Sequence, residues 1–408
     1  MKFSLPQKPW HGNAFIEIET PGDWDVEFCP MQGYDDAALP FAEMEAALKH
    51  PIGTPRLKDM AAGKKRAVII FDDMTRPTRA FDIAPMVLDE LHAAGLRADD
   101  ITFVCALGTH GALTMADFRK KLGSKIIEKY RVFNHNIYEN CVDVGKTKRG
   151  THVLFNREVM AADLKIGIGL VSAHISAGFS GGGKLLLPGV AHIDTICHFH
   201  STDAAMDKNN TGMGCHTGNI LREEINEAAA MAGVDFIINV VVNGRGETTN
   251  IFAGDLYHAH DAAVIKAKQT YQTVNRPKDK DLVIANVFSK PNENLIAVLL
   301  GSSALKSTGG TVVVIADSPE GQVPHYLFGR FGRDYGGRLY PNGSIPLNLK
   351  LIVMTSYPDR TSLDWFANPE SGFIVRSWPE VLDLLGPEYG SGTNVAILPN
   401  AAMQYFIH

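Results

Sequence analysis

Short, mostly apolar runs bounded by turn residues constrain the fold of this chain more than any other feature. Three of them lie in the first half of the sequence: AVIIF at 67–71, ITFVCA at 101–106 and LKIGIGL at 164–170. Runs of this length and composition are typical of strands that are buried on both faces of a parallel sheet. Because helix-like segments separate them, the pattern predicts an α/β fold with mainly parallel strands.

A second group of such runs predicts a second domain. The polar, proline-containing segment TVNRPKDK at 273–280 breaks the pattern, as interdomain boundaries do. Beyond it lie three further apolar runs, at 281–287, 311–316 and 349–355. We therefore expect an N-terminal α/β domain over 1–272 and a C-terminal α/β domain over 281–408, with the active site in the crevice between them. The final run, NVAIL at 394–398, fits either domain.

Periodicity places the remaining elements. Residues 14–29 alternate around a Pro-Gly-Asp turn, which predicts an N-terminal hairpin. Apolar residues at helical or strand spacing give the other expected elements, which are helices at 40–50, 82–94, from 114, at 219–232 and at 256–271, and a strand at 234–243.

The composition is that of a globular protein and excludes some partners. Of the 408 residues, 45% are hydrophobic and 21% are charged, and the formal net charge is −6. This balance argues against nucleic acid or an anionic membrane as the main partner. Five cysteines without a CxxC pair favour reduced thiols in a cytoplasmic protein. The N-terminus lacks the apolar core of a signal peptide, and no run of about eighteen apolar residues predicts a membrane-spanning helix.

Loops rich in chemically active residues follow the three N-terminal strands. They read DDMTRPT at 72–78, GTHG at 108–111 and SAHISAGFSGGGK at 172–184. Because ligands of open α/β sheets bind outside the carboxyl ends of the strands, we expect these loops to converge on one site. A fourth such loop, FSKPNEN at 288–294, follows the first strand of the C-terminal domain.

Residues of these loops have both functional and structural interpretations. Arg76 can bind a carboxylate or phosphate through its planar guanidinium, or it can form an ion pair with Asp72 or Asp73. The sequence leaves both interpretations open. His110 lies between glycines at a strand end, where exposure favours a site residue. His174 alone would be a structural histidine, but the glycines and the lysine that follow it favour a function.

The glycine-lysine loop matches a phosphate-binding loop only in part. Residues Gly178 to Lys184 satisfy G-x-x-x-x-G-K, but Leu185 stands where Ser or Thr would ligate Mg²⁺. Pro188 and Gly189 follow within a turn and prevent the long helix whose N-terminus holds the phosphates in such proteins. A conventional nucleotide hydrolase is therefore disfavoured, while a glycine-rich site for a phosphorylated ligand stays open.

Three histidines follow this loop. His198 and His200 are two residues apart, which points them to opposite faces of a strand, and neither HExxH nor CxxC accompanies them. A single histidine that binds a cofactor-bound metal is therefore favoured over a three-histidine metal centre. Surface or packing roles are expected for His192 and His198.

Two further functions stay open on these residues alone. One is a metal-dependent hydrolase that uses His110, His174 and His200. The other is a nucleotide- or phosphate-binding module that uses residues 178–184.

Taken together, the loops resemble those of a known family. In order along the chain, DDxTRPT, GTH, H-x-x-x-G-F-S-G-G-x-K-x-x-x-P-G and a later histidine resemble the lactate racemase family, the nickel-pincer nucleotide enzymes. The resemblance covers most of the chain, including the two-domain layout. It implies an isomerase that racemises or epimerises a 2-hydroxy acid.

The resemblance also implies roles for individual residues. Lys184 matches the lysine that carries the cofactor, a pyridinium-3-thioamide-5-thiocarboxylic acid mononucleotide with nickel, through a thioamide bond, and His200 matches the protein ligand of the nickel. His110 and His174 match the two acid/base histidines, and Arg76 matches the arginine that positions the substrate carboxylate. Further cofactor contacts are expected at Asp72, Thr75, Gly178, Ser180, Gly181 and Gly182.

In the mechanism that the resemblance implies, one histidine takes the hydroxyl proton while the Cα hydride passes reversibly to the cofactor. The planar 2-keto acid that results reorients, takes the hydride back on its other face and is reprotonated by the second histidine. Neutral imidazoles suit such transfers. The implied partners are a small-molecule 2-hydroxy acid and the cofactor-synthesis proteins that load the enzyme.

The loop of the C-terminal domain departs from the family pattern. Lactate-specific members carry a glutamine and a lysine in this region, whereas the aligned positions here are Ala297 and Leu300. Lys290 and Asn294 are the candidate replacements that bind the substrate. We therefore expect a 2-hydroxy acid other than lactate, and the sequence does not indicate the oligomeric state.

Overall fold

The computed structural model describes residues 1–408 apart from 13, 202–208, 328–331, 333–348, 367, 387 and 407–408. The chain divides into two units, which we name by their place in the sequence. The central unit comprises Asp36–Asn243 and Glu247–Gln269. The terminal unit comprises Met1–Asp35, Gly244–Gly246 and Thr270–His408, so the sequence at both ends of the chain belongs to it.

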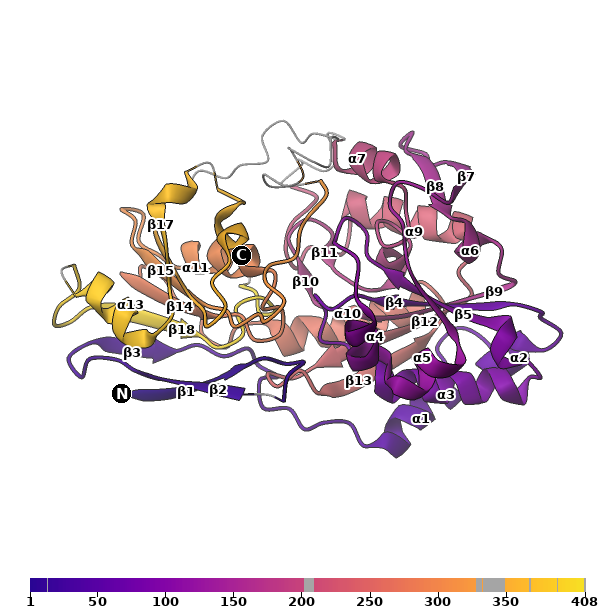
Figure 1. The fold of residues 1–408 in the computed structure, drawn as a ribbon, viewed down its shortest axis with the longest axis horizontal. Coiled ribbons are helices and arrows are strands. Elements are labelled where there is room, and N and C mark those ends of the chain that lie inside the picture. Colours follow the sequence, from indigo (N-terminus) through magenta and orange to yellow (C-terminus); the bar gives the residue numbers. More distant parts are fainter. Residues whose placement is uncertain are drawn as a thin grey trace. The chain divides into compact units, whose positions relative to one another are not determined.

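The central unit is built on a six-stranded sheet (Figure 1). Its strands lie in the order β13 (Thr248–Gly254), β12 (Phe236–Val242), β9 (Leu164–Leu170), β4 (Ala67–Asp72), β5 (Ile101–Ala106) and β6 (Arg131–Asn134). Neighbours pair in parallel except β13, which runs antiparallel to β12. Every residue of β4, β9 and β12 is buried, as their apolar runs predict. The expected α/β fold with mainly parallel strands is confirmed.

Amphipathic helices connect these strands. Helix α3 buries Ile83, Val87 and Leu91, which recur every four residues along one face. Helix α9 begins after the N-cap Asn219 and ends at Gly233, whose φ of +67° lies in the left-handed region that favours glycine. The α-helices are α1 (Phe41–Lys49), α2 (Leu57–Ala61), α3 (Ala80–Ala93), α4 (Met115–Leu122), α5 (Ser124–Lys129), α6 (Arg157–Met160), α7 (Ile193–Ser201), α9 (Ile220–Ala232) and α10 (His258–Tyr271). Smaller elements are the hairpins β7 (Cys141–Lys146) with β8 (His152–Asn156) and β10 (Ala173–His174) with β11 (Gly178–Phe179), and the 3₁₀ turns η1 (Ala98–Asp100) and η2 (Gly182–Leu185).

The terminal unit is built on a second six-stranded sheet, in which all neighbours pair in parallel. Its order is β17 (Gly372–Val375), β16 (Lys350–Met354), β15 (Thr311–Ile315), β14 (Leu282–Asn286), β18 (Asn394–Leu398) and β3 (Asp25–Phe28). Other elements are the hairpin β1 (Lys2–Gln7) with β2 (Ala14–Glu19), the helices α11 (Asn294–Ser302) and α13 (Trp378–Leu385), and the 3₁₀ turns η4 (Arg360–Leu363) and η5 (Pro369–Ser371).

Alternation along the strands gives this second sheet an apolar cluster on each face. Val283 packs in the cluster that holds Ala297 of α11, and the next residue, Ile284, packs in the cluster that holds Val381 of α13. Successive side chains of a strand point to opposite faces, so α11 and α13 cover different faces of the sheet.

The N-terminal segment differs from its prediction. The hairpin is formed by β1 and β2, and not within 14–29. Strand β3 instead pairs in parallel with β18, with Asp25 opposite Asn394. Residues 1–35 therefore belong with the C-terminal sequence, whereas we expected them in a domain over 1–272. An alternating pattern predicts that a segment is a strand but does not identify its partner, which here is remote in sequence.

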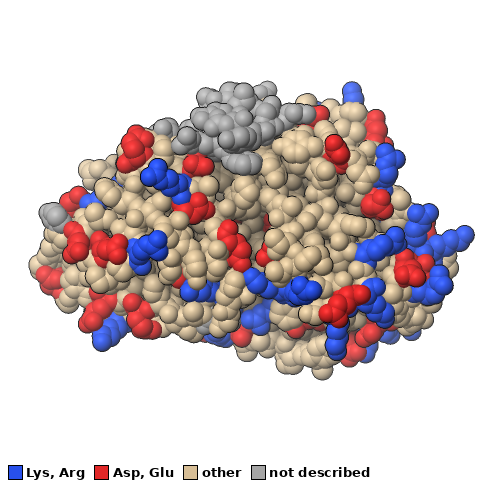
Figure 2. All heavy atoms as spheres, in the orientation of Figure 1, with Lys and Arg blue, Asp and Glu red and all other residues tan. Residues whose placement is uncertain are grey.

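The surface and the thiols agree with a globular chain. None of the described helices is long and apolar enough to cross a membrane. None of the five cysteines forms a disulfide. On the face shown in Figure 2, positive and negative side chains are interspersed, in keeping with the small formal net charge of −6.

Candidate active site

Three loops meet at the carboxyl edge of the central sheet. Strands β9, β4 and β5 are parallel neighbours, so the loops that follow them begin at the same edge. Three hydrogen bonds join these loops: His110 Nδ1 to Asp73 Oδ2 (2.6 Å), Gly108 N to Gly189 O (2.8 Å) and Leu170 N to Asp72 Oδ2 (2.8 Å). The structure thus brings together the loops whose convergence the strand pattern predicts.

Asp73 holds the ring of His110 at one nitrogen. Thr75 donates to the other carboxylate oxygen of Asp73 through its backbone N–H (3.0 Å) and through its hydroxyl. Burial by itself raises the pKa of Asp73, but the hydrogen-bonded His110 and the nearby Arg76 hold that pKa well below its usual range. Because the ionised carboxylate accepts, Nδ1 of His110 carries the proton and Nε2 of the neutral ring carries the lone pair. His110 is therefore oriented to accept a proton at Nε2.

Lys121 of α4 holds the loop after β4, and sequence reasoning missed it. Its side chain is 0% exposed. Its Nζ lies 2.7 Å from Asp72 Oδ1 and donates to the carbonyl oxygens of Asp73 (2.9 Å) and Arg76 (2.8 Å). A buried ammonium needs such partners to offset its lost hydration. The available signal was spacing, since Lys121 follows Phe118 by three residues on the buried face of α4.

Thr75 links Arg76 to the Asp73–His110 pair. The Thr75 hydroxyl donates to Asp73 Oδ1 and accepts from Arg76 Nη1 (2.7 Å), which also donates to the Thr75 carbonyl (3.1 Å). The carboxylates that sequence offered as ion-pair partners of Arg76 have their described hydrogen bonds with other groups. Asp72 accepts from the backbone N–H of Leu170, and Asp73 from His110 and Thr75. Arg76 also lies close enough to Asp73 for its charge to lower the pKa of that carboxyl against the effect of burial, so both interpretations of Arg76 stay open.

His174 shows the opposite hydrogen-bond pattern to His110. Its Nδ1 accepts from the backbone N–H groups of Ser176 (3.3 Å) and Ala177 (3.1 Å). The neutral ring therefore carries its proton on Nε2, which lies 3.1 Å from Lys184 Nζ and can donate to it only where Lys184 is an uncharged amine. The structure places the predicted acid/base histidine and the predicted tether lysine in direct contact.

Side chains from β12, α9 and α10 hold the glycine loop that precedes Lys184. Their hydrogen bonds are Arg222 Nη1 to Gly181 O (3.3 Å), Arg222 Nη2 to Phe179 O, His260 Nε2 to Ser180 O (2.9 Å) and Gly182 N to Asn239 Oδ1 (3.0 Å). Burial lowers the pKa of Arg222 to about 9. The Ser180 hydroxyl donates to Leu170 O (2.8 Å). The described polar groups of this loop therefore bind protein atoms, and sequence reasoning gave no signal for Arg222 or His260.

The glycines of the loop are required by packing within the protein. A Cβ at Gly178 would lie 1.9 Å from the Cys215 carbonyl oxygen, and one at Gly182 would lie 2.7 Å from the His260 ring. Leu185, which occupies the position of a Mg²⁺-ligating hydroxyl, is buried against Gly167 and other atoms of β9. These contacts explain the glycine-rich sequence without a phosphate, so they disfavour a phosphate-binding loop.

His200 lies on helix α7, which occupies the place of the strand expected around 198–200. Its Nδ1 donates to the Ile196 carbonyl (2.8 Å), so Nε2 carries the lone pair. Burial lowers the pKa of His200 to about 4 in spite of that hydrogen bond, and the charge of the nearby Lys184 lowers it further. The exposed His198 contacts Thr151 Oγ1 (3.0 Å), as expected of a surface residue.

The predicted substrate residues of the terminal unit are buried. Asn294 is 0% exposed and donates to the Ser362 carbonyl (3.2 Å), and Lys290 is 2% exposed. Ala297 and Leu300, the positions aligned with the lactate-binding pair, lie in the apolar cluster under α11. All four residues are therefore buried.

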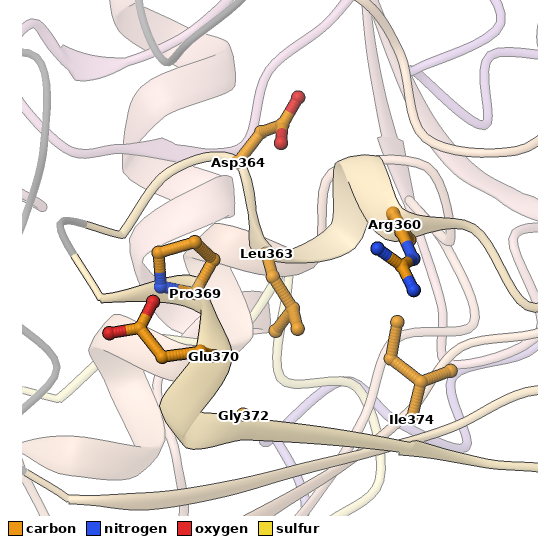
Figure 3. Close-up of a pocket in the computed structure, with 7 residues that line it drawn as sticks. All are labelled: Arg360, Leu363, Asp364, Pro369, Glu370, Gly372 and Ile374. Atoms are coloured by element: carbon orange, nitrogen blue, oxygen red, sulfur yellow. The ribbon is translucent and has the colours of Figure 1, made fainter.

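A cavity of about 480 Å³ lies in the terminal unit (Figure 3). Its lining comprises Arg360, Leu363, Asp364, Pro369, Glu370, Gly372 and Ile374, from η4, η5 and β17. The charged groups on its wall are of both signs, and the lining includes none of the residues that the sequence singled out. It carries no argument for the activity.

Known proteins match the chain in sequence. Residues 11–214 match the family model described as the lactate racemase N-terminal domain. Two similar proteins are both named lactate racemase. The one from Thermoanaerobacterium thermosaccharolyticum is 31% identical over 284 residues, and the one from Lactiplantibacillus plantarum is 30% identical over 290 residues. Each match covers 68% of this chain and 66% of the relative, so the chain spans about two thirds of the length of these relatives.

Two solved structures share the fold. The lactate racemase apoprotein from Thermoanaerobacterium thermosaccharolyticum has a TM-score of 0.78 at 21% identity and covers 100% of both chains. A crystal structure of a protein from Thermotoga maritima has a TM-score of 0.66 at 17% identity, over 92% of this chain and 100% of that one. At these identities the likeness concerns the fold alone.

Proposed function

The chain belongs to the lactate racemase family, and from this membership and the loop geometry we propose that it racemises or epimerises a 2-hydroxy acid. The observation that carries the proposal is the opposite hydrogen bonding of two histidines. His110 donates through Nδ1 and is set to accept a proton at Nε2, whereas His174 accepts at Nδ1 and is set to donate one. Inversion through a planar keto acid can use such a pair, because one group removes the hydroxyl proton as the hydride leaves Cα and the other protonates the oxygen when the hydride returns to the opposite face.

The residues near Lys184 fit the nickel-pincer nucleotide that the family implies. The half-buried amine of Lys184 lies 3.1 Å from His174 Nε2, and burial lowers the pKa of the nearby His200 to about 4, so the His200 imidazole is neutral at neutral pH. The bond from His200 Nδ1 to Ile196 leaves the Nε2 lone pair for a metal, as in other histidine-ligated sites. We propose that Lys184 tethers the group and that His200 binds its nickel, a ligand set suited to square-planar nickel. When bound, the group supplies a hydride acceptor.

The other residues bind the substrate and move its hydroxyl proton. Arg76 binds the substrate carboxylate through its guanidinium, which Thr75 orients. His110 Nε2 takes the hydroxyl proton in one direction of the reaction, and Asp73 stabilises the imidazolium that forms. His174 Nε2 returns a proton to the substrate oxygen in that direction, and the two histidines exchange these roles when the substrate is the other stereoisomer.

The substrate class follows from the terminal unit. Ala297 and Leu300 are buried and apolar, so neither replaces the glutamine and lysine of lactate-specific members. We propose a 2-hydroxy acid other than lactate.

Intact-mass analysis tests the tether. The chain is produced together with the cofactor-synthesis proteins, as wild type, Lys184→Ala and Lys165→Ala. Lys165 is a matched control because it is a buried lysine at the start of β9, the end of the strand opposite to the loop that carries Lys184. Its Nζ donates to the Ala162 carbonyl (2.9 Å). We expect added mass in the wild type and in Lys165→Ala, and none in Lys184→Ala. A fully active chain without added mass contradicts the proposal.

Chiral analysis in heavy water tests the reaction. A panel of 2-hydroxy acids, lactate included, is incubated with the loaded protein. We expect inversion of one non-lactate acid with little solvent deuterium at Cα. Extensive labelling at Cα would indicate proton abstraction from carbon and would contradict the assigned histidine roles.

The two alternative functions lack a supporting observation. Among the described residues, the groups that could share a metal ion are His216, His260 and Asp261, which do not include the histidines expected for a hydrolase. The N–H of Gly182 binds Asn239 and the carbonyl of Ser180 binds His260, which disfavours a phosphate-binding module.

A further inference from the structure

A second cluster of metal-binding groups lies behind the glycine loop of the central unit. His216 precedes α9, and His260 and Asp261 lie in the first turn of α10. One ligand atom from each residue lies within 4.8 Å of the other two. The two rings are 5.5 Å apart between centroids and tilted by 57°. His260 also donates to the Ser180 carbonyl, so the cluster adjoins the loop that carries Lys184.

Both rings present a lone pair without a described partner. His260 is 1% exposed, and since its Nε2 donates to a carbonyl, its Nδ1 carries the lone pair. That buried Nδ1 has no hydrogen-bond partner. His216 Nε2 lies 2.9 Å from Asp261 Oδ1 and donates to it, and its buried Nδ1 likewise has no partner. Buried acceptors that lack donors are rare, and each one calls for a ligand or an ordered water.

The charges around the cluster allow a cation. Asp261 supplies a carboxylate, and its side chain is 59% exposed, so it can rotate to meet an ion. Besides burial, the positive charges of Arg222 and Lys268 lower the pKa of His216. Arg222 directs its two terminal nitrogens to the Phe179 and Gly181 carbonyls. Its buried Nε has no described partner and could donate to a water in the same space. The plain alternative is therefore a single water that accepts from Arg222 and donates to the two rings.

We propose that His216, His260 and Asp261 form a divalent-metal site of the zinc or nickel class. Two imidazoles and one carboxylate are a donor set that Zn²⁺ uses, at about 2.0–2.2 Å, with a fourth position open to water. Rotation of the exposed Asp261 and of His216, whose side chain is 15% exposed, would draw the ligands together. The site is separate from His200 and does not depend on the proposed function.

Metal titration of the cofactor-free protein tests the site. The protein is made without the cofactor-synthesis proteins, stripped with a chelator and titrated with Zn²⁺ by calorimetry and with Co²⁺ by visible absorption. The background is His200→Ala, so that the ligand proposed for the pincer nickel cannot contribute. We expect about one Zn²⁺ per chain and the intense visible bands of four-coordinate Co²⁺.

Substitutions at the surface side of the cluster identify the ligands while leaving the buried His260 intact. We expect His216→Ala to abolish the Co²⁺ bands and Asp261→Asn to weaken Zn²⁺ binding by about 10–100-fold. His258→Ala is the matched control, because His258 is an exposed histidine of the same helix that binds Asp255 instead. Zn²⁺ binding that survives His216→Ala overturns the proposal. So does the absence of Zn²⁺ uptake up to about 100 μM, which would leave the water as the occupant.

Discussion

The two sheets of this protein have similar architecture but use their strand-end polar residues differently. In the central unit, Asp73 and His110 bind each other through one atom each, and Arg76 lies in the same loop as Asp73. In the terminal unit, the Asn286 amide donates to the carbonyls of Pro6 (3.1 Å) and Pro399 (2.9 Å) and accepts from Gln7.

The contrast shows that a polar residue after a parallel strand is not by itself a site residue. Both polar atoms of the Asn286 amide form hydrogen bonds to protein atoms, and the residue is 0% exposed. His110 Nδ1 binds Asp73, and the His110 side chain is 14% exposed. The difference in exposure therefore separates these two residues.

The largest expected effect is on catalysis, in the central unit. Replacing His110 by Asn in the loaded protein should lower the racemisation kcat by about 10²–10⁴-fold, because general acid-base transfer contributes that much. Chiral chromatography of the product measures the rate. The matched control is His92→Asn, since His92 is a half-buried histidine whose ring nitrogens contact Tyr130 Oη and the Leu96 carbonyl. A loss below tenfold in His110→Asn would remove His110 from the proposed machinery.

Replacing Lys121 by Met should be the most destabilising change of those proposed. It leaves the Asp72 carboxylate, 2.7 Å from Nζ, buried without its counter-charge, which costs about 3–5 kcal/mol of unfolding free energy. Denaturant titration of the cofactor-free protein measures it. Arg119→Met on the same helix, where the side chain is exposed, should change stability by less than about 0.5 kcal/mol. Equal stability of the two variants would show that Lys121 does not hold the loop.

His135 is a histidine at a strand end of the central unit, and the pH dependence of stability tests whether it is a structural residue like Asn286. Both ring nitrogens are committed, to the Ala191 carbonyl (2.9 Å) and the Asn156 amide (3.1 Å), and burial lowers its pKa to about 4. The unfolded chain, with a pKa of 6.5 for this group, takes up the proton first as the pH falls. Neutral His135 therefore makes its full contribution to the free energy of unfolding above pH 6.5. This contribution, at most about 3 kcal/mol, is lost as the pH falls from 6.5 to about 4.

Denaturant titrations at several pH values test this dependence. The slope of unfolding free energy between pH 6.5 and 4 should be shallower in His135→Gln than in the wild type. If the two slopes agree, the fold does not hold His135 in its neutral form. Hydrogen bonds from protein groups to both ring nitrogens would then not identify a histidine as structural.

The smallest effect is expected at Asn294, in the terminal unit. Asn294→Ala removes the donor to the Ser362 carbonyl and should cost about 1–3 kcal/mol of unfolding free energy. Steady-state kinetics of the loaded variant should give an unchanged KM. An increase in KM of about tenfold with unaltered stability would instead support the substrate-binding role that the sequence pattern assigned to it.

Much of the site could be predicted because its loops carry distinctive residues at strand ends. The loop contents placed Asp73 and His110 at one sheet edge before their contact was known. The sequence could not show which atoms of each residue already form hydrogen bonds with other groups of the protein. Asp72 and Ser180 were expected to contact the cofactor, yet their described hydrogen bonds are to Lys121, Thr78, Leu170 and Ser172. These partners are set by tertiary packing, which local pattern does not encode.

The sequence by itself determined the central parallel strands of both sheets and the chemical content of the loops after them. Apolar runs of strand length can only be buried between layers, and the residues that follow them must lie at a sheet edge. Tertiary structure alone decided that β3 pairs with β18, and that His200 lies on a helix rather than a strand. It also decided that the glycines before Lys184 make room for His260 and Cys215. The physical reason is that hydrophobic pattern fixes burial, whereas pairing and hydrogen-bond partners depend on groups remote in the chain.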